Sequence, residues 1–97
     1  MKVRYITEVS EDLEDIHGYY ADVAGIGYAD KLVDELLDIM DSLDKFEHRG
    51  NYVREFLALG RKDYRELHHM VFRVIYSIVD EAVVVVAVID GRRNVLP

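Results

Sequence analysis

Arginines are the side chains of this sequence best suited to binding or catalysis, and six of them fall on predicted strands or the loops beside them: Arg54, Arg61, Arg65, Arg73, Arg92 and Arg93. A guanidinium presents five donors in a planar fork, which matches phosphate or carboxylate. Arg73 interrupts an apolar segment, so its charge requires a partner or the solvated face of a sheet. Because acidic residues are plentiful, a salt bridge is the simpler interpretation. Arg92 and Arg93 follow Gly91 and could form either a solvated tail or a contact site.

Other reactive side chains show no catalytic or metal-binding spacing. His68 and His69 are adjacent on a predicted strand, so they point to opposite faces and cannot chelate one ion together. The serines lie outside any nucleophile-elbow pattern, and the absence of cysteine excludes thiol catalysis and Cys-ligated metals. Gly25 and Gly27 follow a predicted helix, so they indicate a helix end and not a phosphate loop. The residues therefore predict no catalytic group, no metal site and no cofactor.

A column of like charges lies on the second predicted helix. Asp30, Asp34 and Asp38 recur every four residues, and Asp41 continues the same acidic side. Adjacent like charges at this spacing weaken an isolated helix slightly. A solvated face is the default interpretation, and a docking surface for a basic partner is the alternative.

Composition and charge limit the classes of function. The 97 residues are 51% hydrophobic and 32% charged, which predicts a single globular domain over 1–97. The net charge of −7 argues against generic nucleic-acid binding, although residues 1–48 carry a balance of −9 and residues 49–97 one of +2. The longest apolar run, Ala82 to Ile89, is too short to span a membrane, and the first residues do not read as a signal peptide. We therefore expect a cytoplasmic protein.

The hydrophobic periodicity changes from helical to strand-like near the middle of the chain. A short strand over 2–8 precedes a helix over 11–24, with Ser10 as its N-cap. Gly25-Ile26-Gly27 links it to a second helix over 28–45. Strands are predicted over 52–59, 64–69, 72–79 and 82–90. This order predicts an α+β fold in which an N-terminal strand and an antiparallel helical hairpin pack on a mainly antiparallel sheet of four to five strands.

Several motifs, taken in order, resemble the RelE/ParE superfamily of bacterial toxins from type II toxin–antitoxin systems. The resemblance covers nearly the whole chain, and its most specific parts lie near the C-terminus. The matching residues are Asp12-Leu13-Glu14-Asp15-Ile16, Tyr19-Tyr20, Ala29, Leu43, Gly50, Tyr64-Arg65-Glu66-Leu67, Phe72-Arg73-Val74-Ile75-Tyr76 and Gly91-Arg92-Arg93. The resemblance implies the same fold, and an antitoxin whose C-terminal segment wraps the toxin.

The superfamily has two branches with different activities. RelE-like members are ribosome-dependent mRNA endonucleases, and the resemblance places Arg73, Arg65 and Arg92 near their basic residues. ParE-like members instead inhibit DNA gyrase without known chemistry of their own. Asp90 stands where the superfamily commonly has a histidine, and a carboxylate there opposes the approach of phosphate. The net charge of −7 also disfavours binding to the polyanionic ribosome.

The resemblance therefore favours a ParE-like toxin that inhibits gyrase by protein–protein contact and has a cognate, ParD-like antitoxin. No direct nucleic-acid binding by the toxin alone is expected, and a homodimer or a hetero-oligomer with the antitoxin is possible. The alternatives are a RelE-like mRNA endonuclease that uses Arg65, Arg73 and Arg92, or a degenerate toxin that only binds its antitoxin. The candidate partner-binding residues are Arg61, Arg65, Arg92, Arg93, Asp34, Asp38 and Asp41.

Overall fold

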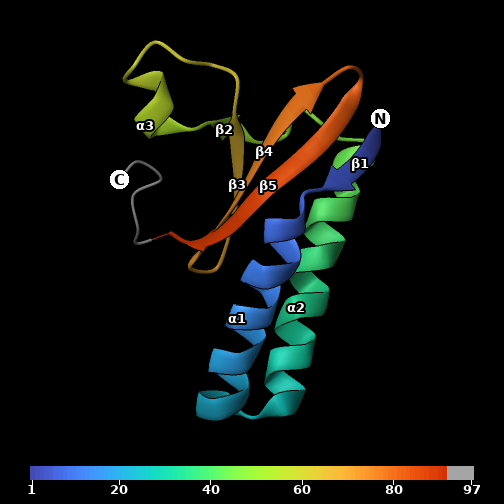
Figure 1. The fold of residues 1–97 in the computed structure, drawn as a ribbon, viewed down its shortest axis with the longest axis vertical. Helices are drawn as coiled ribbons and strands as arrows, with labels where there is room; N and C mark the ends of the chain where they lie inside the picture. Colours follow the sequence, from blue (N-terminus) through green and yellow to red (C-terminus); the bar gives the residue numbers. More distant parts are fainter. Residues whose placement is uncertain (92–97) are drawn as a thin grey trace.

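A five-stranded sheet carries a long helical hairpin on one face (Figure 1). The computed structural model describes residues 1–91. Their elements are β1 (Lys2–Tyr5), α1 (Thr7–Ala24), α2 (Ile26–Asp41), a 3-10 turn η1 (Ser42–Asp44), β2 (Asn51–Tyr52), α3 (Arg54–Leu57), β3 (Arg65–His69), β4 (Phe72–Val79) and β5 (Ala82–Asp90). The sheet order is β1-β5-β4-β3-β2, with β1 parallel to β5 and all other pairs antiparallel. The predicted α+β class and its mainly antiparallel sheet are confirmed.

The first strand ends, and the first helix begins, at earlier residues than predicted. Pairing of β1 with β5 ends at Tyr5, and α1 begins at Thr7 with Ile6 as its N-cap residue. Ser10 is therefore not the N-cap, and its hydroxyl donates within the helix to the Thr7 carbonyl at 3.0 Å. The earlier start lets Val9, which is 1% exposed, join the core, so tertiary packing outweighs the local capping signal.

One glycine makes the link between the two helices. Gly25 has φ 95° and ψ 154°, a conformation that side chains with a Cβ rarely adopt, while Ile26 and Gly27 already belong to α2. The second helix thus runs from 26 to 41, rather than from 28 to 45, and η1 follows it. The hairpin extends beyond the sheet, with its turn at one end of the molecule (Figure 1).

The segment 52–59 is not the predicted strand. Only Asn51 and Tyr52 pair with β3, and Arg54–Leu57 form α3. The apolar residues there follow helical spacing, and Val53 is completely buried. Gly60, at φ 76°, ends the helix, where the Arg61 N–H reaches the Phe56 carbonyl at 2.8 Å, a Schellman ending.

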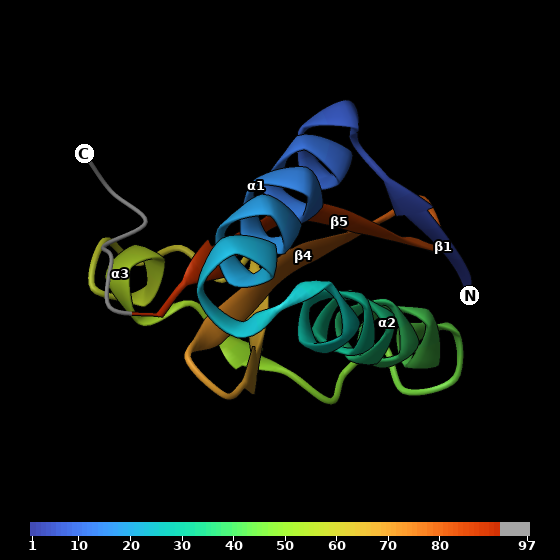
Figure 2. The same cartoon turned by 90° about the horizontal axis from the view of Figure 1, so that it is seen from below.

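The core lies between the hairpin and one face of the sheet. Residues of β4 alternate, so that Phe72, Val74 and Tyr76 face the helices while Arg73 and Ile75 face the other way. The cluster of buried residues comprises Val9, Leu32, Leu36, Met40, Leu43, Leu67, Phe72, Val74, Tyr76, Val83, Val85 and Val88. Figure 2 shows α1 crossing the sheet near β5, with α2 beside it and α3 at the opposite end of the molecule from β1.

A β-bulge shifts the inward-facing positions of β5 part-way along the strand. Tyr76 pairs with Val85 and Ile75 pairs with Ala87, which leaves Val86 as an extra residue. The inward positions therefore shift from Val83 and Val85 to Val88 along the strand.

Candidate functional site

The central arginine of the sheet forms a buried ion-pair cluster. Arg73 is 1% exposed, and its two terminal nitrogens each lie 2.8 Å from an oxygen of Glu55. The same guanidinium donates to Glu66, whose other oxygen lies 2.6 Å from His68 Nε2. The hydrogen bonds that Arg73 donates to Glu55, followed by the one to Glu66, raise the pKa of Arg73 above its usual range. Arg73 therefore forms the salt bridge that its apolar surroundings predicted.

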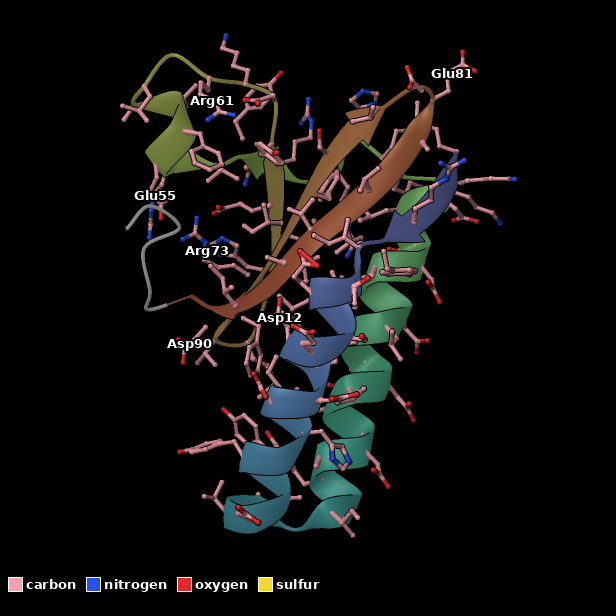
Figure 3. The ribbon with its side chains drawn as sticks, viewed as in Figure 1. Asp12, Glu55, Arg61, Arg73, Glu81 and Asp90 are labelled. Atoms are coloured by element: carbon pink, nitrogen blue, oxygen red, sulfur yellow. The ribbon has the colours of Figure 1, made fainter. Side chains whose placement is uncertain are left out.

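Two distant elements bring the carboxylates to Arg73. Glu66 and His68 alternate along β3 and share the side of Arg73, which pairs in register with His68. Glu55 comes from α3, which lies over this side of the sheet (Figure 3). An arginine enclosed in this way has no surface to offer to a phosphate.

The predicted basic residues of the β2–β3 region are also engaged with neighbours. Arg65 donates to the Gly50 carbonyl at 2.8 Å and stacks over the Tyr52 ring, 4.4 Å from its centroid. Arg61 makes a two-point ion pair with Asp63, at 2.6 and 3.2 Å. Hydrogen bonding to Asp63 raises the pKa of Arg61, and the pKa of Asp63 falls for the same reason. Arg61 remains exposed at the surface and Arg65 is half-buried.

The acidic residues of α2 lie elsewhere on the molecule. Asp34 and Asp38 are exposed, whereas Asp41 accepts a hydrogen bond from the Tyr5 hydroxyl. Asp30, from the same predicted column, pairs with His17 at 2.7 Å. Of these four acidic residues, Asp34 and Asp38 are therefore the ones left solvated without a side-chain hydrogen bond within residues 1–91. Arg92 and Arg93 lie outside the described residues.

A groove that the sequence analysis did not identify lies between α1 and the end of β5. Its volume is about 400 Å³, and it is lined by Asp12, Asp15, Ile16, Tyr19, Tyr20, Phe72, Val88, Ile89 and Asp90. Figure 3 shows Asp12 near Asp90, where α1 meets the end of the sheet. The helical spacing of Asp12, Asp15 and Tyr19 marked one face in the sequence, but the contribution of β5, more than 60 residues later, required the fold.

Asp12, which lines this groove, is hydrogen-bonded to β5. One of its oxygens accepts a hydrogen bond from the Val88 backbone N–H at 2.9 Å. Burial raises the pKa of Asp12, and the hydrogen bond from Val88 opposes that rise only in part.

Two further findings concern the part of the chain that the structure describes. Within residues 1–91, no three histidine or acidic side chains gather as a metal site would require. Among the helices of the same residues, none combines the length and the apolar character needed to cross a bilayer.

Comparison with known proteins gives a family match and matches to solved structures. A family model described as the ParE toxin of type II toxin–antitoxin system, parDE, matches residues 3–95. A solved chain of the chromosomal ParDE TA system from P. aeruginosa superposes with a TM-score of 0.76 at 15% identity, over 93% of this chain and 95% of that one. A search of curated proteins finds no match. At 15% identity, the structural match supports the fold alone.

Proposed function

This chain belongs to the ParE toxin family of type II toxin–antitoxin systems, and from that premise we propose that it inhibits DNA gyrase by protein–protein contact. A small ParD-like antitoxin, encoded beside it, neutralises the toxin by covering its docking surface. The toxin needs no bond-making chemistry of its own, because gyrase already cleaves DNA and the toxin stabilises the cleaved state.

The burial of Arg73 is the observation that favours this proposal over the nuclease alternative. An endonuclease needs a cation that can reach the scissile phosphate as charge develops. Arg73, at the position that a RelE-like nuclease would use, is 1% exposed and bound by Glu55 and Glu66. Releasing it would leave two carboxylates facing an incoming phosphate, which is unfavourable.

Arg65, the second residue of the nuclease alternative, is also committed to structure. It holds the Gly50 carbonyl at 2.8 Å and stacks on Tyr52. The two arginines therefore support the architecture of the sheet, and the exposed Arg61 remains a candidate for contact with gyrase, together with Arg92 and Arg93. Asp34 and Asp38 on α2 are candidates for attracting basic residues of the antitoxin.

Parallel assays of both targets test the proposal. Purified toxin is added to gyrase with plasmid DNA, and separately to ribosomes programmed with mRNA. The proposal expects trapped, cleaved plasmid and intact mRNA. Cleaved mRNA at ribosomal A sites with unaffected gyrase would support the nuclease, and no effect on either target would support a degenerate toxin. Heat-denatured toxin is the control.

A further inference from the structure

The groove between α1 and β5 is lined by acidic and aromatic side chains. Its charged lining residues are Asp12, Asp15 and Asp90, and no basic residue of the described chain lines it. Tyr19 and Tyr20 meet edge to face at 5.0 Å, and Tyr20 meets Phe72 at 6.0 Å. The groove therefore combines negative charge with flat apolar surface.

We infer that this groove receives an arginine side chain of the antitoxin. The inference rests on the proposed toxin–antitoxin pairing and names the chemistry of the contact. Charge complementarity identifies a cation, since Asp12 and Asp15 line a cavity of about 400 Å³. The aromatic wall favours arginine over lysine, because a planar guanidinium stacks on rings while it donates to carboxylates.

Asp12 is the residue best placed to bind the guanidinium. Its first oxygen is occupied by the Val88 N–H, and within residues 1–91 its second oxygen accepts no hydrogen bond. The charge is thus partly withdrawn from water without a cation beside it, which is unfavourable. A cation bound beside Asp12 would compensate for the water that this carboxylate has lost. The ion pair should therefore be stronger than one with a fully solvated carboxylate.

The surroundings of the groove suit an amphipathic segment around that arginine. Tyr19 and Val23 are each 61% exposed, and Ile26, just past the hairpin turn, is 67% exposed. These side chains extend an apolar strip from the groove toward the tip of the hairpin. A segment with an arginine and, farther along, apolar residues would cover both features.

A small probe tests the groove without the antitoxin. Full-length toxin labelled with ¹⁵N is titrated with N-acetyl-arginine amide and, separately, with its neutral citrulline counterpart. We expect shifts of the Asp12, Asp15 and Tyr20 amides with the arginine probe alone. Equal shifts with citrulline, or shifts elsewhere only, would overturn the inference.

Variants of the groove test the contact with the antitoxin. The binding partner in this assay is the protein encoded by the adjacent reading frame. Asp12→Asn keeps an acceptor for the Val88 N–H, so the fold is retained, and the exposed Asp15→Asn provides a second, independent variant. Together they should weaken binding roughly 10- to 100-fold. Glu14→Gln, which lies on the far side of α1, is the matched control and should bind normally.

The outcomes separate this inference from the proposed function. Normal affinity of the double variant would overturn the arginine contact and leave the pairing intact. An adjacent-frame protein that fails to bind the unmodified toxin, together with a groove that still binds the arginine probe, would overturn the pairing and leave the cationic site.

Discussion

Glu55 and Arg73 form a two-point ion pair across 18 residues of sequence, with each carboxylate oxygen 2.8 Å from a different guanidinium nitrogen. This pair fastens α3 to the side of the sheet away from the hairpin (Figure 3). It also encloses Arg73, which the nuclease alternative would need at the surface. The same contact therefore stabilises the fold and argues for a toxin that acts by docking.

Removing the arginine should destabilise the protein strongly. Arg73→Ala removes the guanidinium that Glu55 and the buried Glu66 share, so the free energy of unfolding should fall by about 3–5 kcal/mol. Urea denaturation followed by circular dichroism measures the loss. Arg54→Ala, whose side chain is 69% exposed on the same helix as Glu55, should stay within about 0.5 kcal/mol. A stable Arg73→Ala variant would contradict the structural role.

Asp12 should make the protein less stable as pH rises. Its pKa is raised in the folded state, so the folded protein holds the proton over a range above 3.8 in which the unfolded chain has lost it. The free energy of unfolding therefore falls as pH increases through that range. Asp12→Asn removes this penalty, so its stability advantage over the parent should grow from pH 3.5 toward neutrality in urea denaturation series.

Asp63 supplies a control of opposite sign. Arg61 lowers the pKa of Asp63 in the folded state, so its contribution is present above 3.8 and is lost as pH falls through the lowered value. Asp63→Asn should therefore be less stable than the parent near neutrality, and the difference should shrink in acid. The same slope for both variants would contradict the assignment.

The tight turn between β4 and β5 offers a stabilising substitution. Asp80 and Glu81 have φ of 50° and 60°, which side chains with a Cβ disfavour. Paired positive φ values are typical of a type I′ turn, for which Asp-Gly is a preferred sequence. Glu81→Gly should raise the free energy of unfolding by about 1 kcal/mol. Glu81→Ala separates the effect of charge, and an equal gain from alanine would contradict the backbone explanation.

Hydrophobic periodicity predicted most of this fold. The strands predicted over 72–79 and 82–90 match β4 and β5, which pair antiparallel. The helix predicted over 28–45 contains α2, whose Leu32, Leu36 and Met40 are buried at helical spacing. The strand predicted over 52–59 was wrong, because the contact of Glu55 with Arg73 and the ending at Gly60 favour a helix there. The residue pattern within 52–59 carries no information about a contact with a residue 18 positions away.

The candidate site was less predictable than the fold. The salt bridge of Arg73 followed from the cost of burying a charge, but its two partners did not. The acidic groove joins Asp12 to Asp90, which only the crossing of α1 over β5 brings together. The family resemblance predicted the class of protein, because its motifs extend over nearly the whole chain, and a family model matches residues 3–95.

Two arginines near the C-terminus remain candidates for the gyrase contact. Their position after Gly91 places them beyond the described residues, so the prediction rests on sequence. Arg92→Ala with Arg93→Ala should change stability by no more than about 0.5 kcal/mol. Growth arrest on induction should weaken, and added salt should weaken gyrase inhibition by the unmodified toxin in the same way. Full toxicity of the folded double variant would move the contact to the hairpin.

Gyrase supercoiling in the presence of increasing toxin tests the central claim most directly. Relaxed plasmid, ATP and purified gyrase are mixed with the toxin, and the supercoiled and linear products are quantified on gels. We predict that supercoiling falls and linear DNA accumulates with toxin concentration, and that prior addition of the adjacent-frame protein reverses both effects. Undiminished supercoiling at a toxin concentration that arrests growth on expression would contradict the account.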